Sequence, residues 1–238
     1  MRALARHVTP RRSFWNTPAG LALLDWPTHN APTISATTCR SATDWIAPPV
    51  PSSVADLLAD LARAFDALGI SWYLFGAQAA IVYGVARLTA DVDVTIRAPA
   101  TPTAEWLAGL ERHGFERRFV DPAFIEQTRV LPVVHRSTGL PVDIVLAGPG
   151  LEEEFLRRAV MQLVDGVRVP VVEIADLVVL KILASRPKDL DDVVALLRVH
   201  GDAIDAVRVG TVLTMLEEAL GQSDLLVAFE QCRIRARV

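Results

Sequence analysis

The chain has 238 residues, of which 51% are hydrophobic and 22% charged, and 24 basic against 28 acidic side chains give a formal net charge of −4. This apolar content excludes a disordered chain, no run approaches the roughly 20 apolar residues of a membrane helix, and the acidic balance argues against a general DNA-coating protein. Two cysteines, Cys39 and Cys232, are too few for a disulfide scaffold or a cysteine-built zinc site, so we expect a reducing, cytoplasmic compartment.

Residues 1–52 differ from the rest of the chain in composition. They hold three of the five tryptophans and only two acids, Asp25 and Asp44. Prolines, serines and threonines interrupt every periodic pattern in this stretch. We therefore interpret residues 1–52 as an irregular or disordered leader.

The first regular element that the sequence predicts is a helix, which Ser52 or Ser53 can cap and Gly69 ends. Its apolar residues recur at three- and four-residue steps between Val54 and Leu68. Apolar runs and turn residues then predict, in chain order, a strand at 70–75, a short helix at 77–83, a strand at 91–96, a helix at 103–113, strands at 130–135 and 141–147, and a hairpin at Asp165-Gly166.

From Glu173 onward the pattern is helical. The expected helices cover residues 174–185, 188–199, 206–220 and 224–230. An α+β front half is thus followed by a helical back half, which is the fold class that the sequence predicts.

Two acids interrupt the apolar strand expected at 91–96. Because side chains alternate along a strand, Asp91 and Asp93 lie on one side, roughly 6.5–7 Å apart at the backbone, and can converge on a cation. Their repulsion and desolvation would be relieved by a divalent metal. The alternative is that the pair lines a solvated sheet face or sits at a strand end.

Two further features change this balance. Phe75-Gly76-Ala77 lies on a strand-to-helix turn, where glycine allows close backbone approach and a helix N-terminus offers free N–H groups to a phosphate. Asp143 is a single acid inside another apolar strand, so it needs a nearby cation or a strand end. Three carboxylates below a glycine turn form a cradle for Mg²⁺ and a triphosphate, in which two ions roughly 3.5–4 Å apart can stabilise an in-line displacement.

The only two lysines of the chain, Lys181 and Lys188, lie seven residues apart. Lys181 follows Leu177, Val178, Val179 and Leu180 in a segment that is apolar nearly all round, so it needs a partner or a ligand. The acids that follow Pro187 have a simpler interpretation as favourable charges in the first turns of a helix, and Lys188 could pair with Asp192 across one turn.

In their order along the chain, these residues resemble a known family. Gly76-Ala77, Tyr83-Gly84, Arg87, Thr89, Asp91-Val92-Asp93 and the later Asp143 resemble the nucleotidyltransferase superfamily of the polymerase-β type. The segment from Lys181 through Arg186 and Lys188-Asp189 to Asp192 resembles the Lys-x4-Arg…Lys/Arg-Asp-x-x-Asp helical motif of its AbiE-type toxin branch. The resemblance implies a nucleotidyltransferase core at 53–172, built on a small mixed sheet with flanking helices, and a helical C-terminal domain at 173–238.

The resemblance also implies roles for the acids and the glycine turn. Asp91 and Asp93 would hold the metals, and Asp143 would hold one of them while acting as base toward the acceptor hydroxyl. Gly76 and Ala77 would meet the β- and γ-phosphates through their backbone N–H groups. Ala77 stands where the family often has serine, so a hydroxyl contact to phosphate is missing.

The remaining implied roles belong to charged residues around this centre. Lys181 would contact the triphosphate or the acceptor, and Asp189 and Asp192 would orient groups behind the site. Arg87 could reach a phosphate, although a surface arginine in a loop is the alternative.

The activity implied is the Mg²⁺-dependent transfer of a nucleoside monophosphate from a nucleoside triphosphate such as ATP to an acceptor hydroxyl, with two ions expected and Mn²⁺ as a substitute. The AbiE-type motif implies a toxin–antitoxin or phage-defence component that acts on tRNA and has a cognate antitoxin. Two alternatives stay open: the same chemistry on a protein or aminoglycoside acceptor, and an inactive module that binds a nucleotide or a partner, which Ala77 keeps in view.

Overall fold

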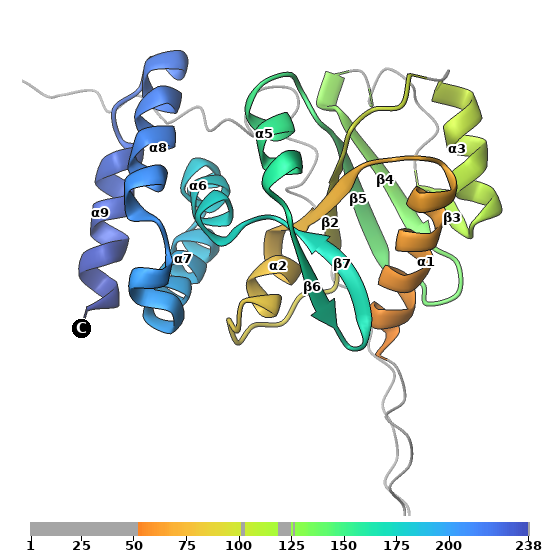
Figure 1. Cartoon of the computed structure of the whole chain (residues 1–238), viewed down its shortest axis with the longest axis horizontal. Coiled ribbons are helices and arrows are strands. Elements are labelled where there is room, and N and C mark those ends of the chain that lie inside the picture. Colours follow the sequence, from red (N-terminus) through yellow and green to blue (C-terminus); the bar gives the residue numbers. More distant parts are fainter. Residues whose placement is uncertain (1–51, 101–102, 119–124, 126, 238) are drawn as a thin grey trace, which may run out of the picture.

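A computed structural model describes residues 52–100, 103–118, 125 and 127–237 (Figure 1). The leader expected at residues 1–52 lies outside this part of the chain except for Ser52. No helix in the described ranges is both long and apolar enough to cross a membrane.

The described part of the chain contains a mixed sheet of seven strands in the order β3-β4-β5-β2-β1-β7-β6. The pairs β2–β5 and β1–β7 are parallel and all others are antiparallel. The strands are β1 (Trp72–Phe75), β2 (Val92–Ile96), β3 (Phe115–Arg117), β4 (Val130–His135), β5 (Pro141–Leu146), β6 (Val160–Val164) and β7 (Val167–Val171). The predicted mixed sheet is confirmed, and β6 and β7 form the hairpin expected at Asp165-Gly166.

Helices flank this sheet and continue beyond it, which confirms the predicted α+β class. They are α1 (Ser53–Ala67), α2 (Gly76–Val82), α3 (Thr103–Arg112), α5 (Leu151–Arg158), α6 (Ile174–Ala184), α7 (Pro187–His200), α8 (Ala206–Leu220) and α9 (Leu225–Ala236), with a 3₁₀ turn at Gly201–Ala203. In Figure 1, α6 to α9 gather on the left, and α1 and α3 lie with the sheet on the right. The domain division at residue 172 stays a prediction, although β7 ends and α6 begins beside it.

The α1 helix shows how local sequence sets an element. The Ser52 hydroxyl accepts a hydrogen bond from the Ala55 N–H at 3.1 Å, which is the expected cap. The apolar stripe that includes Leu57, Leu61 and Phe65 is fully buried against the sheet. Gly69 follows with φ of +64°, a conformation that glycine adopts without strain.

Three expectations need correction. The sequence reading missed α5, because this helix has only eight residues and its three apolar side chains, Leu151, Phe155 and Leu156, form too short a pattern to stand out. It also missed β3, an edge strand of three residues that pairs with β4 alone and carries one core side chain, Phe115. The last helix runs to Ala236 instead of ending near Glu230, because Cys232 continues its buried face.

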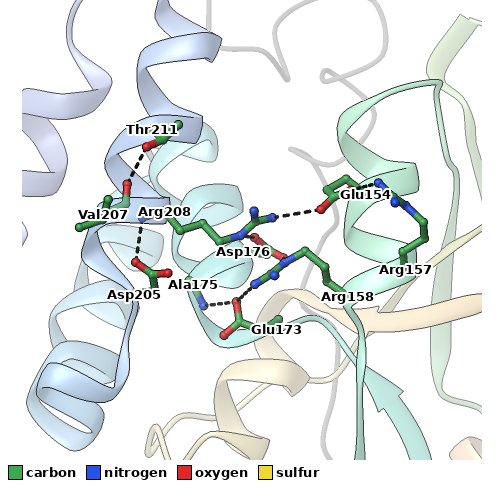
Figure 2. A network of polar contacts seen from close by, with 10 residues as sticks. All are labelled: Glu154, Arg157, Arg158, Glu173, Ala175, Asp176, Asp205, Val207, Arg208 and Thr211. Carbon is green, nitrogen blue, oxygen red and sulfur yellow. Dashed lines mark hydrogen bonds and ion pairs between the residues drawn. The ribbon is translucent and has the colours of Figure 1, made fainter.

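A polar network joins the helical region to the sheet region (Figure 2). Asp176 near the start of α6 is fully buried, and its carboxylate accepts from Arg158 Nε of α5 at 2.9 Å and from Arg208 Nε of α8 at 2.7 Å. Glu173, which caps α6 through the Ala175 N–H, also accepts from Arg158 at 3.1 Å. Three helices thus depend on one buried carboxylate.

We expect Asp176→Asn to lower the free energy of unfolding by about 3 kcal/mol. The change leaves two arginines facing a neutral amide, and breaking a buried ion pair on one side is strongly destabilising. Urea denaturation measures the change. The matched control is Arg233→Gln, which removes an exposed pair with Glu230 and should alter stability by less than about 0.5 kcal/mol. Equal midpoints for the two variants would contradict a central role for Asp176.

Candidate active site

Strand pairing brings the predicted acids together. The parallel register of β2 and β5 places Asp93 beside Asp143. On the other side of β2, the antiparallel β1 places Phe75 beside Asp93, so Gly76 at the start of α2 lies next to the same carboxylate. Asp91 lies directly before β2. The sheet itself therefore assembles the acidic part of the site.

A cavity of about 260 Å³ opens at this point. Its walls come from the β1–α2 turn, the loop before β2, strands β4 and β5, and the beginning of α7. Seven of the predicted site residues line it: Gly76, Ala77, Arg87, Asp91, Asp93, Asp143 and Asp189. Their roles stay predictions, but the structure places them around one space.

Lys181 and Asp192, the other two predicted site residues, are not among the lining residues of this cavity. Lys181 is 3% exposed, and its Nζ lies 2.6 Å from Asp192 Oδ2 and 3.6 Å from Asp189 Oδ1. The buried lysine thus has the partner that its apolar surroundings required. Asp192 also accepts from Arg87, so the pairing with Lys188 that we considered is replaced by two other cations.

Sequence reasoning missed two cations of the cavity wall. Arg186 and Lys188 both line the cavity, one on each side of Pro187 at the start of α7. Arg186 is held by Asp189, whose Oδ1 accepts from its Nη2 at 3.2 Å. The available signal was the Lys-x4-Arg spacing itself, in which the lysine is buried behind the wall and the arginine reaches the cavity.

The carboxylates repel one another in this partly dry space. Burial, followed by the negative charges of Asp91 and Asp143, raises the pKa of Asp93 to about 7, and the positive charges of Arg186 and Lys181 offset this only in part. Burial also raises the pKa of Asp143, with a nearby charge on Arg118 acting in the opposite direction. Each raised pKa means that a further cation would be favourable in the cavity.

Gly76 permits the closest approach in the site. Its φ is +66°, and a Cβ built on it would lie 2.0 Å from Asp93 Oδ2. Real Cβ atoms do not come this near to another atom, so position 76 must be glycine while the carboxylate of Asp93 keeps its place. The turn is therefore shaped around the acid.

The turn after β1 also offers backbone donors. Phe75 precedes α2 and provides no side-chain cap, so the first N–H groups of the helix, at Gly76 and Ala77, have no partner from the capping residue. Both residues line the cavity. The side chain of Ala77 adds no hydroxyl, so any phosphate contact at this turn comes from backbone N–H groups.

The donor set fits a hard divalent cation. Asp91, Asp93 and Asp143 supply carboxylate oxygens, the ligands that Mg²⁺ and Mn²⁺ take in proteins. In the described residues no group of three or more acids, histidines or cysteines is already arranged to hold a metal. Asp91 accepts from the Thr89 hydroxyl, and Asp143 accepts from Arg118 Nη1 at 3.4 Å. Each of these contacts engages one oxygen of its carboxylate.

We expect Gly76→Ala to lower the free energy of unfolding by at least about 2 kcal/mol, because the left-handed backbone strain alone costs roughly 1–2 kcal/mol and the clash with Asp93 adds to it. In an Asp93→Ala background the same change should cost only the strain. Urea denaturation of the wild type, the two single variants and the double variant tests this expectation. Gly210→Ala, where a Cβ meets open space within α8, is the control and should stabilise slightly. An equal cost of Gly76→Ala in both backgrounds would contradict the contact with Asp93.

We expect Asp93→Asn to stabilise the metal-free protein in a pH-dependent way. The folded pKa of about 7 lies above the unfolded value near 4, so ionisation of Asp93 opposes folding as the pH rises from about 4 to above 7. Wild type and variant should therefore be nearly equal near pH 4.5, and the variant should be more stable by on the order of 2 kcal/mol at pH 8.

Urea denaturation with a chelator present, at several pH values, measures this difference. Asp66→Asn, at an exposed position of α1, serves as the control and should show no such trend. A difference between wild type and Asp93→Asn that stays constant with pH would show that the charge of Asp93 is not the cause.

Several solved structures are similar to the chain at low identity. One is an antigenic nucleotidyltransferase-like protein from Paracoccidioides brasiliensis, at 18% identity and a TM-score of 0.48, covering 74% of this chain and 91% of that one. Another is JHP933 from Helicobacter pylori, at 13% and 0.41, covering 78% and 93%. A third is the lincosamide antibiotic adenylyltransferase LnuA with bound lincomycin, at 13% and 0.41, covering 57% and 91%. At these values the likenesses say nothing about substrate.

The chain also matches a protein family over most of its length. No curated protein sequence matches the chain significantly. The family described as "Nucleotidyl transferase AbiEii toxin, Type IV TA system" matches residues 57–228, from α1 into α9. This match covers most of the chain and agrees with the resemblance seen in the Asp-x-Asp and Lys-x4-Arg motifs. The protein therefore belongs to the AbiEii toxin family and is a nucleotidyltransferase.

Proposed function

We propose that this protein transfers a nucleoside monophosphate from a nucleoside triphosphate to an acceptor hydroxyl in a reaction that depends on Mg²⁺ or Mn²⁺. The observation that carries the proposal is the convergence of Asp91, Asp93 and Asp143 on one cavity beside a glycine turn. An inactive module has no use for three carboxylates around one cavity, two of which, Asp93 and Asp143, have a raised pKa, so the arrangement favours catalysis over simple binding.

The acids would divide two tasks. Asp91 and Asp93 would hold the divalent cations, and Asp143 would hold one of them. When bound, these cations neutralise charge that builds up on the phosphate oxygens and orient the reacting groups. Asp143 would accept the proton of the acceptor hydroxyl, a role that suits a carboxylate whose pKa is raised by burial. The acceptor oxygen then bonds to the α-phosphorus, the bond from that phosphorus to the bridging oxygen breaks, and pyrophosphate leaves.

The triphosphate would lie between the β1–α2 turn and the start of α7. Backbone N–H groups of Gly76 and Ala77 can donate to phosphate oxygens on one side. Arg186 and Lys188 supply positive charge on the other side. Backbone donors and two cations would compensate for the hydroxyl that Ala77 lacks.

Behind this wall, Lys181 would act through its neighbours. Its ammonium group holds Asp189 and Asp192, Asp189 holds Arg186, and Asp192 holds Arg87. Both arginines line the cavity. The buried lysine would therefore orient the two arginines without touching the nucleotide.

For the acceptor we propose tRNA, with the protein acting in the cytoplasm as the toxin of a toxin–antitoxin pair and with a cognate antitoxin as partner. The type IV toxin–antitoxin description of the family supports the toxin role and the antitoxin partner, and it names no acceptor. A protein side chain or an aminoglycoside is the competing acceptor class, and the experiment below separates them.

We expect purified protein with Mg²⁺ to transfer label from an α-phosphate-labelled nucleoside triphosphate to tRNA, and not from a γ-labelled one. Asp91→Asn, Asp93→Asn and Asp143→Asn should each reduce labelling by at least about 100-fold, since each removes a group required in the transition state. Asp66→Asn is the matched control and should label normally.

Cell-lysate protein and aminoglycosides are tested as acceptors in parallel. Label on either of these in place of tRNA would reassign the acceptor while the chemistry stands. Transfer of the γ-label to an acceptor would contradict the proposed reaction. So would the absence of nucleotide binding in the presence of Mg²⁺.

A further inference from the structure

A row of residues crosses the sheet at the level of the acids. β3 and β4 pair so that Arg117 lies opposite Val133, and the next residue, Arg118, donates its backbone N–H to the Pro132 carbonyl at 3.0 Å. Pro132 in turn lies opposite Asp143 on β5, which lies beside Asp93 on β2. Arg118, Pro132, Asp143 and Asp93 therefore occupy one line across four neighbouring chain segments.

This register determines which way Arg118 faces. Residues directly opposite each other on paired strands point to the same face of a sheet. Arg118 consequently shares the face of Asp143, and its Nη1 lies 3.4 Å from Asp143 Oδ1. Arg117, one residue earlier, points to the other face, where its Nε donates to Glu111 at 2.8 Å.

The contact between Arg118 and Asp143 is partly shielded from water but long. The exposed fractions of the two side chains are 26% and 12%, and in the described residues Arg118 is the one cation within ion-pair distance of Asp143. At 3.4 Å the pair is near the upper limit of a hydrogen bond, so it can be exchanged at modest cost. A divalent cation attracts the same carboxylate with twice the charge.

We propose that Arg118 is the resident counter-ion of Asp143, and that its guanidinium competes with a divalent cation for this carboxylate. The inference rests on the proposed function, because it assumes that Asp143 binds metal. It assigns to Arg118 a positioning role: it holds Asp143 in the metal-free protein and competes with the metal for it. A cation held by Asp91 and Asp93 alone would leave the pair between Arg118 and Asp143 in place.

The test is a titration of the full-length chain with Mn²⁺ in the absence of nucleotide. Electron paramagnetic resonance measures the concentration of free Mn²⁺ at each point. We expect Arg118→Gln to tighten Mn²⁺ binding by about 2- to 5-fold, the range that loss of one partly exposed ion pair implies. Arg117→Gln, the neighbour on the opposite face, should bind Mn²⁺ like wild type. In an Asp143→Asn background, Arg118→Gln should have no effect, because the contested carboxylate is gone.

A thermal readout covers the case in which Arg118→Gln is too unstable to titrate. Without metal, Arg118→Gln should melt below wild type, and saturating Mn²⁺ should raise its melting temperature more than that of wild type. Arg118→Lys, which keeps the charge, should fall between the two. A purely structural role for Arg118 would instead lower the melting temperature equally with and without Mn²⁺.

The outcomes separate the two proposals. Unchanged Mn²⁺ affinity in Arg118→Gln, or an effect that persists in the Asp143→Asn background, would overturn the counter-ion role while leaving the proposed function in place. Absence of saturable Mn²⁺ binding in the wild type would overturn both.

Discussion

Mutual repulsion among three carboxylates is the constraint around which the structure is arranged. Parallel pairing of β2 with β5 forces Asp93 and Asp143 to be neighbours, and Asp91 adds a third charge to the same cavity. Charges this close oppose folding unless cations or protons compensate them. The sheet therefore concentrates negative charge at this point. A bound metal, together with the cations that surround a bound nucleotide, would neutralise that charge.

The helical region supplies and positions part of the compensating positive charge. The α6 helix is anchored at its beginning by Asp176, which binds arginines from α5 and α8. Near its end the same helix carries Lys181, which holds two acids of α7. One buried helix of 11 residues therefore ties the packing of the helical region to the wall of the cavity. Misplacement of either end would be transmitted to Arg186 and Arg87.

Much of the fold and of the candidate site could be predicted from the sequence, because the alternation and periodicity of apolar residues indicate which side chains are buried. Isolated acids in apolar strands predicted residues of the cavity, and a lysine in an apolar segment predicted a charged partner or a ligand for that lysine. The partners themselves could not be read. The approach of Arg118 to Asp143 depends on the register of three strands, and the sequence reading gave Lys188 no role in the site because no local pattern shows which way the start of α7 faces. The α5 helix was missed because three apolar side chains within eight residues make too short a pattern.

The tight contact between Gly76 and Asp93 has a consequence for how this site can change in evolution. A side chain at position 76 and a carboxylate at position 93 cannot coexist in this geometry, whereas glycine at 76 still fits after the carboxylate at 93 is lost. Loss of the two residues is therefore ordered: a lineage that abandons catalysis can lose the acid first and the glycine afterwards, but not the reverse. Among relatives that keep this turn, a residue other than glycine at 76 marks a protein whose acid has already gone.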